Sequence, residues 1–293
     1  MKLYSHRQLF IFLFVIISLM LLGSFFDYQI SLKLYDAKHM FGILLSAYGQ
    51  LPAMLCLIGG GGLLMKDVFD RQTRKETFII TFIFVFILNL FVFVMLSFDT
   101  LKYIPQMPLS IAVIISLFII ITVNIIIFRL CENKDHDMLQ KIAWFLILTP
   151  ILTLLVVNII KIFWQRPRMR FISTHPEISF QPWWMIGNSL KEPLSMQGIP
   201  ADEFKSFPSA HTACAACCFT TGVLLLLNKR FEGKGYLLFS ISFIFTLMVG
   251  LSRIVAGAHF LSDITCGMAI SFFIQALLAK KIFHIKSVKM KER

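Results

Sequence analysis

Long uninterrupted apolar runs, many of them about twenty residues in length, dominate this 293-residue chain and leave few folds open to it. Inside a bilayer, every backbone N–H and C=O must find a partner within its own helix or in a closed barrel, and barrel strands alternate between apolar and polar residues. These runs do not alternate, and a composition with 57% hydrophobic and 15% charged residues argues against a soluble fold. The sequence therefore predicts an all-α fold, a polytopic transmembrane helical bundle of about eight spans, at residues 9–26, 41–65, 77–98, 109–128, 142–162, 209–228, 236–252 and 260–279.

Basic residues collect in short segments beside the apolar runs, as is typical of loops on the cytoplasmic side. With eight spans, four such segments fall on one side of the membrane, which predicts that both termini are cytoplasmic. The net charge of +12 then reflects topology and attraction to anionic headgroups, so we expect no nucleic-acid partner. The four segments carry Lys2 and Arg7; Lys66, Arg71, Arg74 and Lys75; Lys229, Arg230 and Lys234; and Lys280, Lys281, Lys286, Lys289, Lys291 and Arg293.

Three features of the apolar runs have more than one interpretation. The first run follows a short basic stretch, as a signal peptide would, but its length and the lack of a small-residue cleavage site favour a retained anchor. The glycines at 59–62 permit close helix packing, a local break or a re-entrant segment, and we expect packing. The CAACC stretch at 214–218 superficially offers a zinc or redox pair, but cysteines within or beside apolar runs favour packing.

Three polar stretches stand at the ends of apolar runs, two of them flanking a long polar insertion at 163–208. They are KIFWQRPRMR at 161–170, FPSAHT at 207–212 and SRIVAGAHFLSD at 252–263. Ionisable residues at membrane depth are costly and usually functional. Because the fifth and seventh spans end, and the sixth and eighth begin, on the same side, the topology predicts that all three stretches share one face. With cytoplasmic termini, that face is extracytoplasmic.

Cations are concentrated in these stretches and suit an oxyanion, above all a phosphate. Arginine's planar fork pairs with two phosphate oxygens, and lysine adds a point charge. The same groups would stabilise the charge that develops on a phosphoryl group during its transfer. These cations include Lys161, Arg166, Arg168 and Arg253.

A further anion-binding element is predicted at the start of the sixth span. Pro208 stands where a helix would begin. Ser209, Ala210 and His211 would then lie in the first turn, whose free N–H groups and dipole favour an anion. His211 is also placed to protonate a leaving alkoxide and later to activate water.

His259 and Asp263 stand four residues apart, which on one helix face brings the carboxylate within reach of the imidazole. A carboxylate bonded to one ring nitrogen leaves the other free to attack phosphorus, so His259 is the predicted nucleophile and Asp263 its orienting partner. Metal-assisted hydrolysis needs several acidic or histidine ligands, whereas Asp263 is the one carboxylate in the three stretches, with Asp202 and Glu203 nearby. We therefore expect catalysis without a metal or another cofactor.

Simpler interpretations exist for the same residues. Lys161 and Arg166 at a helix end could snorkel to lipid headgroups. A His–Asp pair inside the membrane could relay protons in a transporter, and the cationic cluster could bind lipid headgroups in a lipid transporter that performs no chemistry. The conjunction of three stretches on one face favours an enzyme.

The three stretches resemble the signature of the type 2 phosphatidic acid phosphatase (PAP2) superfamily, K-x6-RP, PSGH and SR-x5-H-x3-D. KIFWQRPRM places Arg168 after Lys161 with six intervening residues, and PSAH supplies residues 208–211. SRIVAGAHFLSD, which begins with Ser252 and Arg253, matches the third motif at its full spacing.

The signature is altered at two positions. Met169 replaces the proline of the first motif, although Arg166 and a proline stand just before it; the spacing favours Arg168 as the phosphate ligand. Ala210 replaces the glycine of PSGH. Alanine keeps the backbone N–H but restricts φ, so activity is expected to survive if this residue is helical.

The resemblance implies a membrane enzyme that dephosphorylates a lipid phosphate or diphosphate through a phosphohistidine. Candidate substrates are phosphatidic acid, phosphatidylglycerol phosphate and undecaprenyl diphosphate; a phosphotransferase that uses a lipid or glycan acceptor is the alternative. We expect a bacterial plasma membrane with the site on its outer face. The predicted parts are additional helices at 1–141, a PAP2-like core at 142–280 and a basic cytoplasmic tail at 281–293. The implied roles are nucleophile His259, acid and base His211, and phosphate binding by Lys161, Arg168, Ser209, Ala210 and Arg253, with Arg166 and Ser252 as additional candidates.

Overall fold

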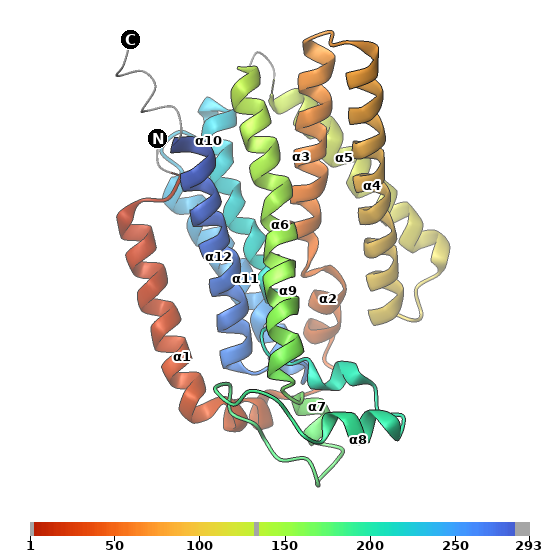
Figure 1. The fold of residues 1–293 in the computed structure, drawn as a ribbon, viewed down its shortest axis with the longest axis vertical. Coiled ribbons are helices and arrows are strands. Elements are labelled where there is room, and N and C mark those ends of the chain that lie inside the picture. Colours follow the sequence, from red (N-terminus) through yellow and green to blue (C-terminus); the bar gives the residue numbers. More distant parts are fainter. Residues whose placement is uncertain (1–2, 132–134, 285–293) are drawn as a thin grey trace.

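The computed structural model describes residues 3–131 and 135–284, and within these ranges the chain is helical and contains no strand. Eight helices are long and apolar enough to cross a membrane, which confirms the predicted all-α transmembrane bundle. They run alternately up and down (Figure 1). Seven of these spans contain one long helix each: α1 (His6–Leu34), α3 (Leu51–Asp70), α4 (Lys75–Tyr103), α5 (Leu109–Leu130), α6 (His136–Trp164), α11 (Gly235–Val255) and α12 (Leu261–His284). The remaining span, Ala210–Leu227, is formed by shorter elements. The short ones are α2 (Met40–Tyr48), α7 (Met169–Ile172), α8 (Lys191–Met196), α9 (Ala210–Ala215) and α10 (Leu224–Leu227), with 3-10 turns η1 (Ala201–Phe204), η2 (Ala216–Val223) and η3 (Lys229–Phe231).

Helix α1 is longer at both ends than the predicted span at 9–26. Ser5 and Gln8 form a capping box, in which each side chain accepts a hydrogen bond from the backbone N–H of the other. The helix continues past residue 26 and places Asp27 inside a membrane-spanning segment. A carboxylate at this position is costly unless it is paired.

The second span is broken between α2 and α3, at residues 49 and 50. A Cβ on Gly49 would lie 2.8 Å from a methyl group of Val249, so α2 can approach α11 only with glycine here. The glycines at 59–62 instead continue α3, and a Cβ on Gly60 would lie 2.8 Å from the Ala143 carbonyl of α6. The glycine run therefore serves helix packing, as predicted, and the break lies ten residues earlier.

The sixth span is not a regular α-helix, because α9 continues as the 3-10 helix η2 before α10. An irregular helix in a membrane needs other groups to satisfy its backbone. Buried side chains provide them, and the cysteines of this span pack without forming disulfides. The carbonyl of Ala216 accepts from Gln275, that of Cys217 from Thr220, that of Cys218 from Ser242 and that of Phe219 from Tyr4.

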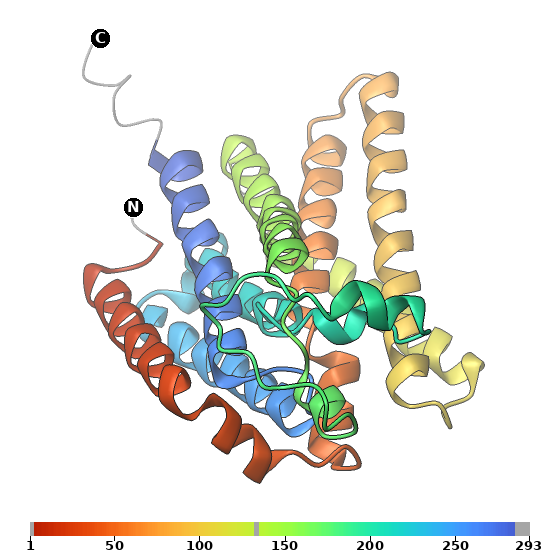
Figure 2. The ribbon, with the colours of Figure 1, turned by 60° about the horizontal axis from the view of Figure 1, so that its bottom comes forward.

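The two ends of the bundle carry different loops. The connections at 71–74 and 228–234 lie at one end, and the insertion at 163–208 lies at the other, folded across the helix ends (Figures 1 and 2). The Trp183 indole ties the insertion to α1 by donating to Ser24 Oγ at 3.0 Å. Lys2 and residues 285–293, which carry part of the predicted cytoplasmic charge, lie outside the described residues.

Candidate active site

A cavity of about 240 Å³ lies at the end of the bundle that carries the insertion. Each of the three polar stretches contributes to its wall, so the structure brings them together as the topology predicted. The end of α6 and the start of the insertion supply one side, the first turn of α9 a second, and the end of α11 with the following turn a third. From the three stretches, the wall contains Lys161, Arg168, Arg170, Ala210, His211, Arg253 and His259.

Two cations in the wall are almost fully buried. The exposed fractions are 7% for Lys161 and 1% for Arg253. Lys161 Nζ donates to the Lys205 carbonyl at 2.5 Å, and an Nη of Arg253 donates to Ser46 Oγ. Neither cation forms an ion pair with a carboxylate of the described chain. Because an unpaired buried cation is strongly destabilising, the cavity favours an anionic ligand.

Arg168 also lines the cavity and pairs with a carboxylate at its rim. Its Nη2 lies 2.9 Å from Asp202 Oδ2. Partial burial alone would raise the pKa of Asp202, but Arg168 and nearby lysines outweigh it and lower this pKa. The Nε atoms of Arg168 and Arg253 are buried and have no hydrogen-bond partner among the described residues. An oxyanion in the cavity would supply acceptors for such donors.

The His259 imidazole is held in one tautomer by a backbone carbonyl. Its Nδ1 lies 2.6 Å from the carbonyl oxygen of Ser206. A carbonyl can only accept, so Nδ1 carries the proton and Nε2 keeps its lone pair. Burial, with only 2% of the residue exposed, lowers the pKa of His259 to about 3, so the ring is neutral at physiological pH. These are the properties of a nitrogen nucleophile.

The tautomer and the low pKa of His259 can be tested together. We expect ¹⁵N spectra of histidine-labelled protein to show one neutral, Nδ1-protonated ring from pH 8 down to pH 5, with His259→Asn providing the assignment. A ring that protonates near pH 6.5 would contradict this assignment. The unfolded chain binds this proton near pH 6.5 and the folded protein only near pH 3, so acidification between these values should destabilise the fold.

Asp263 acts on His259 less directly than the spacing predicted. Its Oδ2 lies 3.8 Å from His259 Nδ1, beyond hydrogen-bond distance. The same oxygen accepts from Ser206 Oγ at 2.5 Å and from the Phe260 backbone N–H at 2.7 Å. Asp263 therefore fixes Ser206 and the start of α12, and Ser206 in turn orients His259.

Arg166 and Arg168, two residues apart in the first stretch, lie in different surroundings. Arg168 lines the cavity, as its spacing from Lys161 predicts. Arg166 is fully buried, is not among the residues of the cavity wall, and donates to Asp263 Oδ1 at 2.5 Å. The structure thus places Arg168 with the cavity and Arg166 with the carboxylate behind it.

Ser209 and Ala210 form the start of α9. Ser209 is buried and caps the helix, its Oγ accepting from the Thr212 N–H at 3.3 Å. It is not among the lining residues; its own N–H donates to the Asp263 carbonyl at 2.9 Å. Gly267 of α12 packs so closely on the Ser209 backbone that a Cβ would clash. Ala210 is helical and lines the cavity, so alanine fits the place of the motif's glycine without positive φ.

The turn between α11 and α12 depends on Gly257. Its φ is +63°, in the left-handed region that favours glycine. A Cβ here would lie 2.6 Å from a ring carbon of Tyr35 and 3.0 Å from Arg170 Cβ. Ser252, just before the turn, is buried, is not among the lining residues and bonds the Val249 carbonyl at 2.6 Å.

Replacement of Gly257 by alanine is expected to lower the melting temperature and the activity, because left-handed strain, about 1–2 kcal/mol, adds to these clashes. Gly187→Ala is the matched control: its φ is +81°, but a Cβ there meets nothing within 4 Å. Thermal unfolding of both variants in detergent measures the difference. Equal losses in the two variants would show that the contacts around residue 257 contribute nothing.

The family model of the PAP2 superfamily matches residues 142–286. This region belongs to the PAP2 superfamily. Membership indicates phosphatase activity on phosphate esters. Comparisons with curated proteins and with solved structures found no match. The match contains all three polar stretches, and it begins after the first four spans.

Helices before the PAP2 region complete the site. Gln50, Lys102 and Tyr103 also line the cavity. His211 Nε2 lies 3.2 Å from the Ser46 carbonyl, and 3.4 Å from both Gln50 Nε2 and the Tyr103 hydroxyl. Sequence reasoning missed these residues. The signal for them in the sequence was weak. Gln50 follows a glycine within one apolar run, and Lys102 and Tyr103 stand just after the end of another.

The middle of the insertion does not contribute to the cavity wall. None of the lining residues comes from 171–200; Asp202 and Lys205 follow that segment. Trp184 is exposed, whereas Trp183 packs between α1 and Phe207, 6.2 Å from that ring. In this structure, residues 171–200 lie outside the cavity wall, and Trp183 links this part of the PAP2 region to α1.

Proposed function

We propose that this chain is an integral membrane lipid phosphatase that works through a covalent phosphohistidine at His259. The single observation that carries the proposal is the His259 ring, whose Nδ1 bonds the Ser206 carbonyl while Nε2 keeps a lone pair in a cationic cavity. A nucleophile held in one tautomer beside phosphate-binding cations is what phosphoryl transfer to nitrogen requires. The PAP2 match supports the reaction class.

The proposed reaction has two steps. In the first, Nε2 of His259 bonds the phosphorus, the bond from phosphorus to the leaving oxygen breaks, and His211 gives that oxygen a proton. In the second, water loses a proton to His211 and attacks the phosphorus, and the phosphorus–nitrogen bond breaks. Charge on the equatorial oxygens would be stabilised by Lys161, Arg168, Arg253 and the N–H of Ala210.

We infer that the cavity faces the extracytoplasmic side of a plasma membrane, which we expect to be bacterial. The basic loops at 66–76 and 229–235 support this orientation, because they lie at the opposite end of the bundle. A lipid phosphate could then reach the cavity with its chains in the outer leaflet. The substrates to test are phosphatidic acid, phosphatidylglycerol phosphate and undecaprenyl diphosphate.

The test uses purified protein in detergent with EDTA, these three lipids and water enriched in ¹⁸O. We expect released phosphate to contain an oxygen from that water. With ³²P-labelled substrate, we expect a label on the protein that is stable in base and lost in acid, as phosphohistidine is. Transfer to an added lipid without release would indicate a phosphotransferase. If phosphate is neither released nor transferred, the proposal is contradicted and a lipid transporter is favoured.

A further inference from the structure

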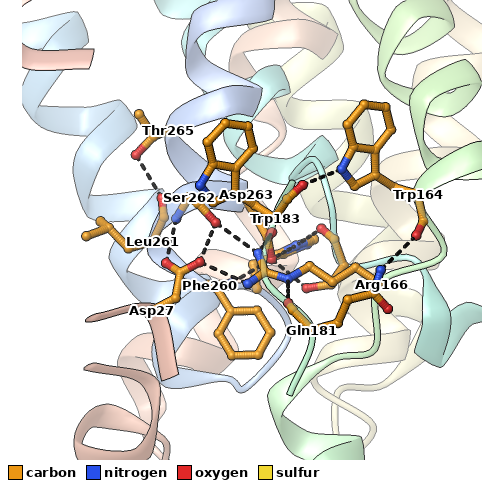
Figure 3. A network of polar contacts seen from close by, with 12 residues as sticks. Asp27, Trp164, Arg166, Gln181, Trp183, Phe260, Leu261, Ser262, Asp263 and Thr265 are labelled. Atoms are coloured by element: carbon orange, nitrogen blue, oxygen red, sulfur yellow. Dashed lines mark hydrogen bonds and ion pairs between the residues drawn. The ribbon is translucent and has the colours of Figure 1, made fainter. Parts of the chain in front are cut away.

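Asp27 of α1 is a buried carboxylate outside the PAP2 region that contacts Arg166 and Ser262 (Figure 3). Only 2% of Asp27 is exposed. Its Oδ1 accepts from the Ser262 N–H at 2.9 Å; its Oδ2 accepts from the Ser262 hydroxyl and from Arg166 Nη2 at 2.9 Å. Both oxygens face donors, as the oxygens of an ionised carboxylate do. Asp27 is thus attached to the start of α12 and to the insertion.

Arg166 links Asp27 to Asp263. Its Nη2 donates to Asp27, and its Nη1 donates to Asp263 at 2.5 Å and to Ser262 Oγ at 2.9 Å. Its Nε donates to the Gln181 carbonyl at 2.7 Å. The guanidinium carbon lies 4.3 Å from the centre of the Phe260 ring. The fork is therefore held on every side in one orientation.

The same contacts continue to the nucleophile. Asp263 accepts from Ser206 Oγ, and the Ser206 N–H donates to the Arg166 carbonyl at 3.0 Å. The Ser206 carbonyl accepts from His259 Nδ1. Asp27 is not among the cavity-lining residues, so it can act on the reaction only through this chain of contacts or through its charge.

Charge gives a reason for a second carboxylate. Arg166 and Asp263 alone would form a neutral pair. Burying the Asp27 carboxylate beside this pair adds a desolvation cost, although the pair is already neutral without it. Two carboxylates and one guanidinium leave one negative charge behind His259. When Nε2 bonds phosphorus and Nδ1 keeps its proton, the ring becomes cationic. A negative charge nearby stabilises that cation.

We propose that Asp27 is a positioning residue for phosphoryl transfer: through Arg166 and Asp263 it holds Ser206 against His259 and favours the cationic phosphohistidine. The inference rests on the proposed function. It also assigns a role to α1, which lies outside the PAP2 region.

The test compares Asp27→Asn with Asp36→Asn, which removes the same charge just beyond α1, where the carboxylate accepts from the Lys38 N–H. We expect Asp27→Asn to lower kcat about 10-fold to 100-fold, the range measured for outer partners of metal-binding histidines, with KM unchanged. The rate of ³²P labelling should fall in parallel. We expect Asp36→Asn to retain the parent kcat.

A readout independent of activity separates this inference from the proposed function. In ¹⁵N spectra, Asp27→Asn should shift the His259 ring from one tautomer toward a mixture, whether or not the protein hydrolyses lipids. An unchanged ring signal, or a kcat loss that only follows the loss of folded protein, would overturn the inference. If Asp27→Asn does not fold, Ser262→Ala decides, because it removes the hydroxyl that donates to Asp27 and accepts from Arg166. This variant should change the ring signal in the same direction, and an unchanged signal again overturns the inference.

Discussion

Replacement of His259 by asparagine is expected to lower kcat for lipid phosphate hydrolysis by about 10⁴-fold or more, the scale of losing a covalent nucleophile. Asparagine has no ring nitrogen to attack phosphorus, but its polar side chain can still face the Ser206 carbonyl in a buried position. The ³²P label on the protein should disappear together with the released phosphate. Both are measured on the same purified variant.

His175→Asn is the matched control for this substitution. His175 lies in the insertion and contacts Phe171, and it is not among the residues that line the cavity. This variant should retain the parent kcat and the label. A His259→Asn protein that still becomes labelled would place the nucleophile elsewhere.

Arg168→Ala is expected to lower kcat/KM about 100-fold to 1000-fold, as loss of a preorganised charge at a reacting phosphate does. Arg168 lines the cavity and has a buried Nε without a partner among the described residues. Arg168→Lys should recover only part of the loss, because an ammonium group cannot bind two phosphate oxygens in a fork. Steady-state kinetics on one lipid phosphate measures all three proteins.

Arg230→Ala removes the same charge at the opposite end of the bundle, in η3, and should leave kcat/KM unchanged. If Arg168→Ala keeps the kcat/KM of the parent protein, the six-residue spacing from Lys161 indicated the wrong arginine. The geometry gives Arg166 another function, because its fork is occupied by Asp27 and Asp263.

The residue that binds the His259 imidazole differs from the one that the spacing predicted: it is the Ser206 carbonyl, not the Asp263 carboxylate. A separation of four residues brings two side chains together when both lie on one helix. Here α12 begins only at Leu261, after the turn at Gly257, so His259 precedes the helix. The Asp263 carboxylate accepts from the Phe260 N–H, and the Ser206 carbonyl of the insertion accepts the hydrogen bond from the imidazole N–H. No pattern in the sequence indicates that carbonyl.

The sequence by itself determined the all-α bundle, its eight spans and the shared face of the three polar stretches. Each follows from local rules, since a backbone in lipid must bond within its own helix and every span reverses direction. Only the tertiary structure decided that Asp27, Ser46 and Tyr103 of earlier helices contact residues of the three polar stretches. Apolar spans look alike in sequence, and which of them pack together depends on the fit of small residues and buried polar groups between helices.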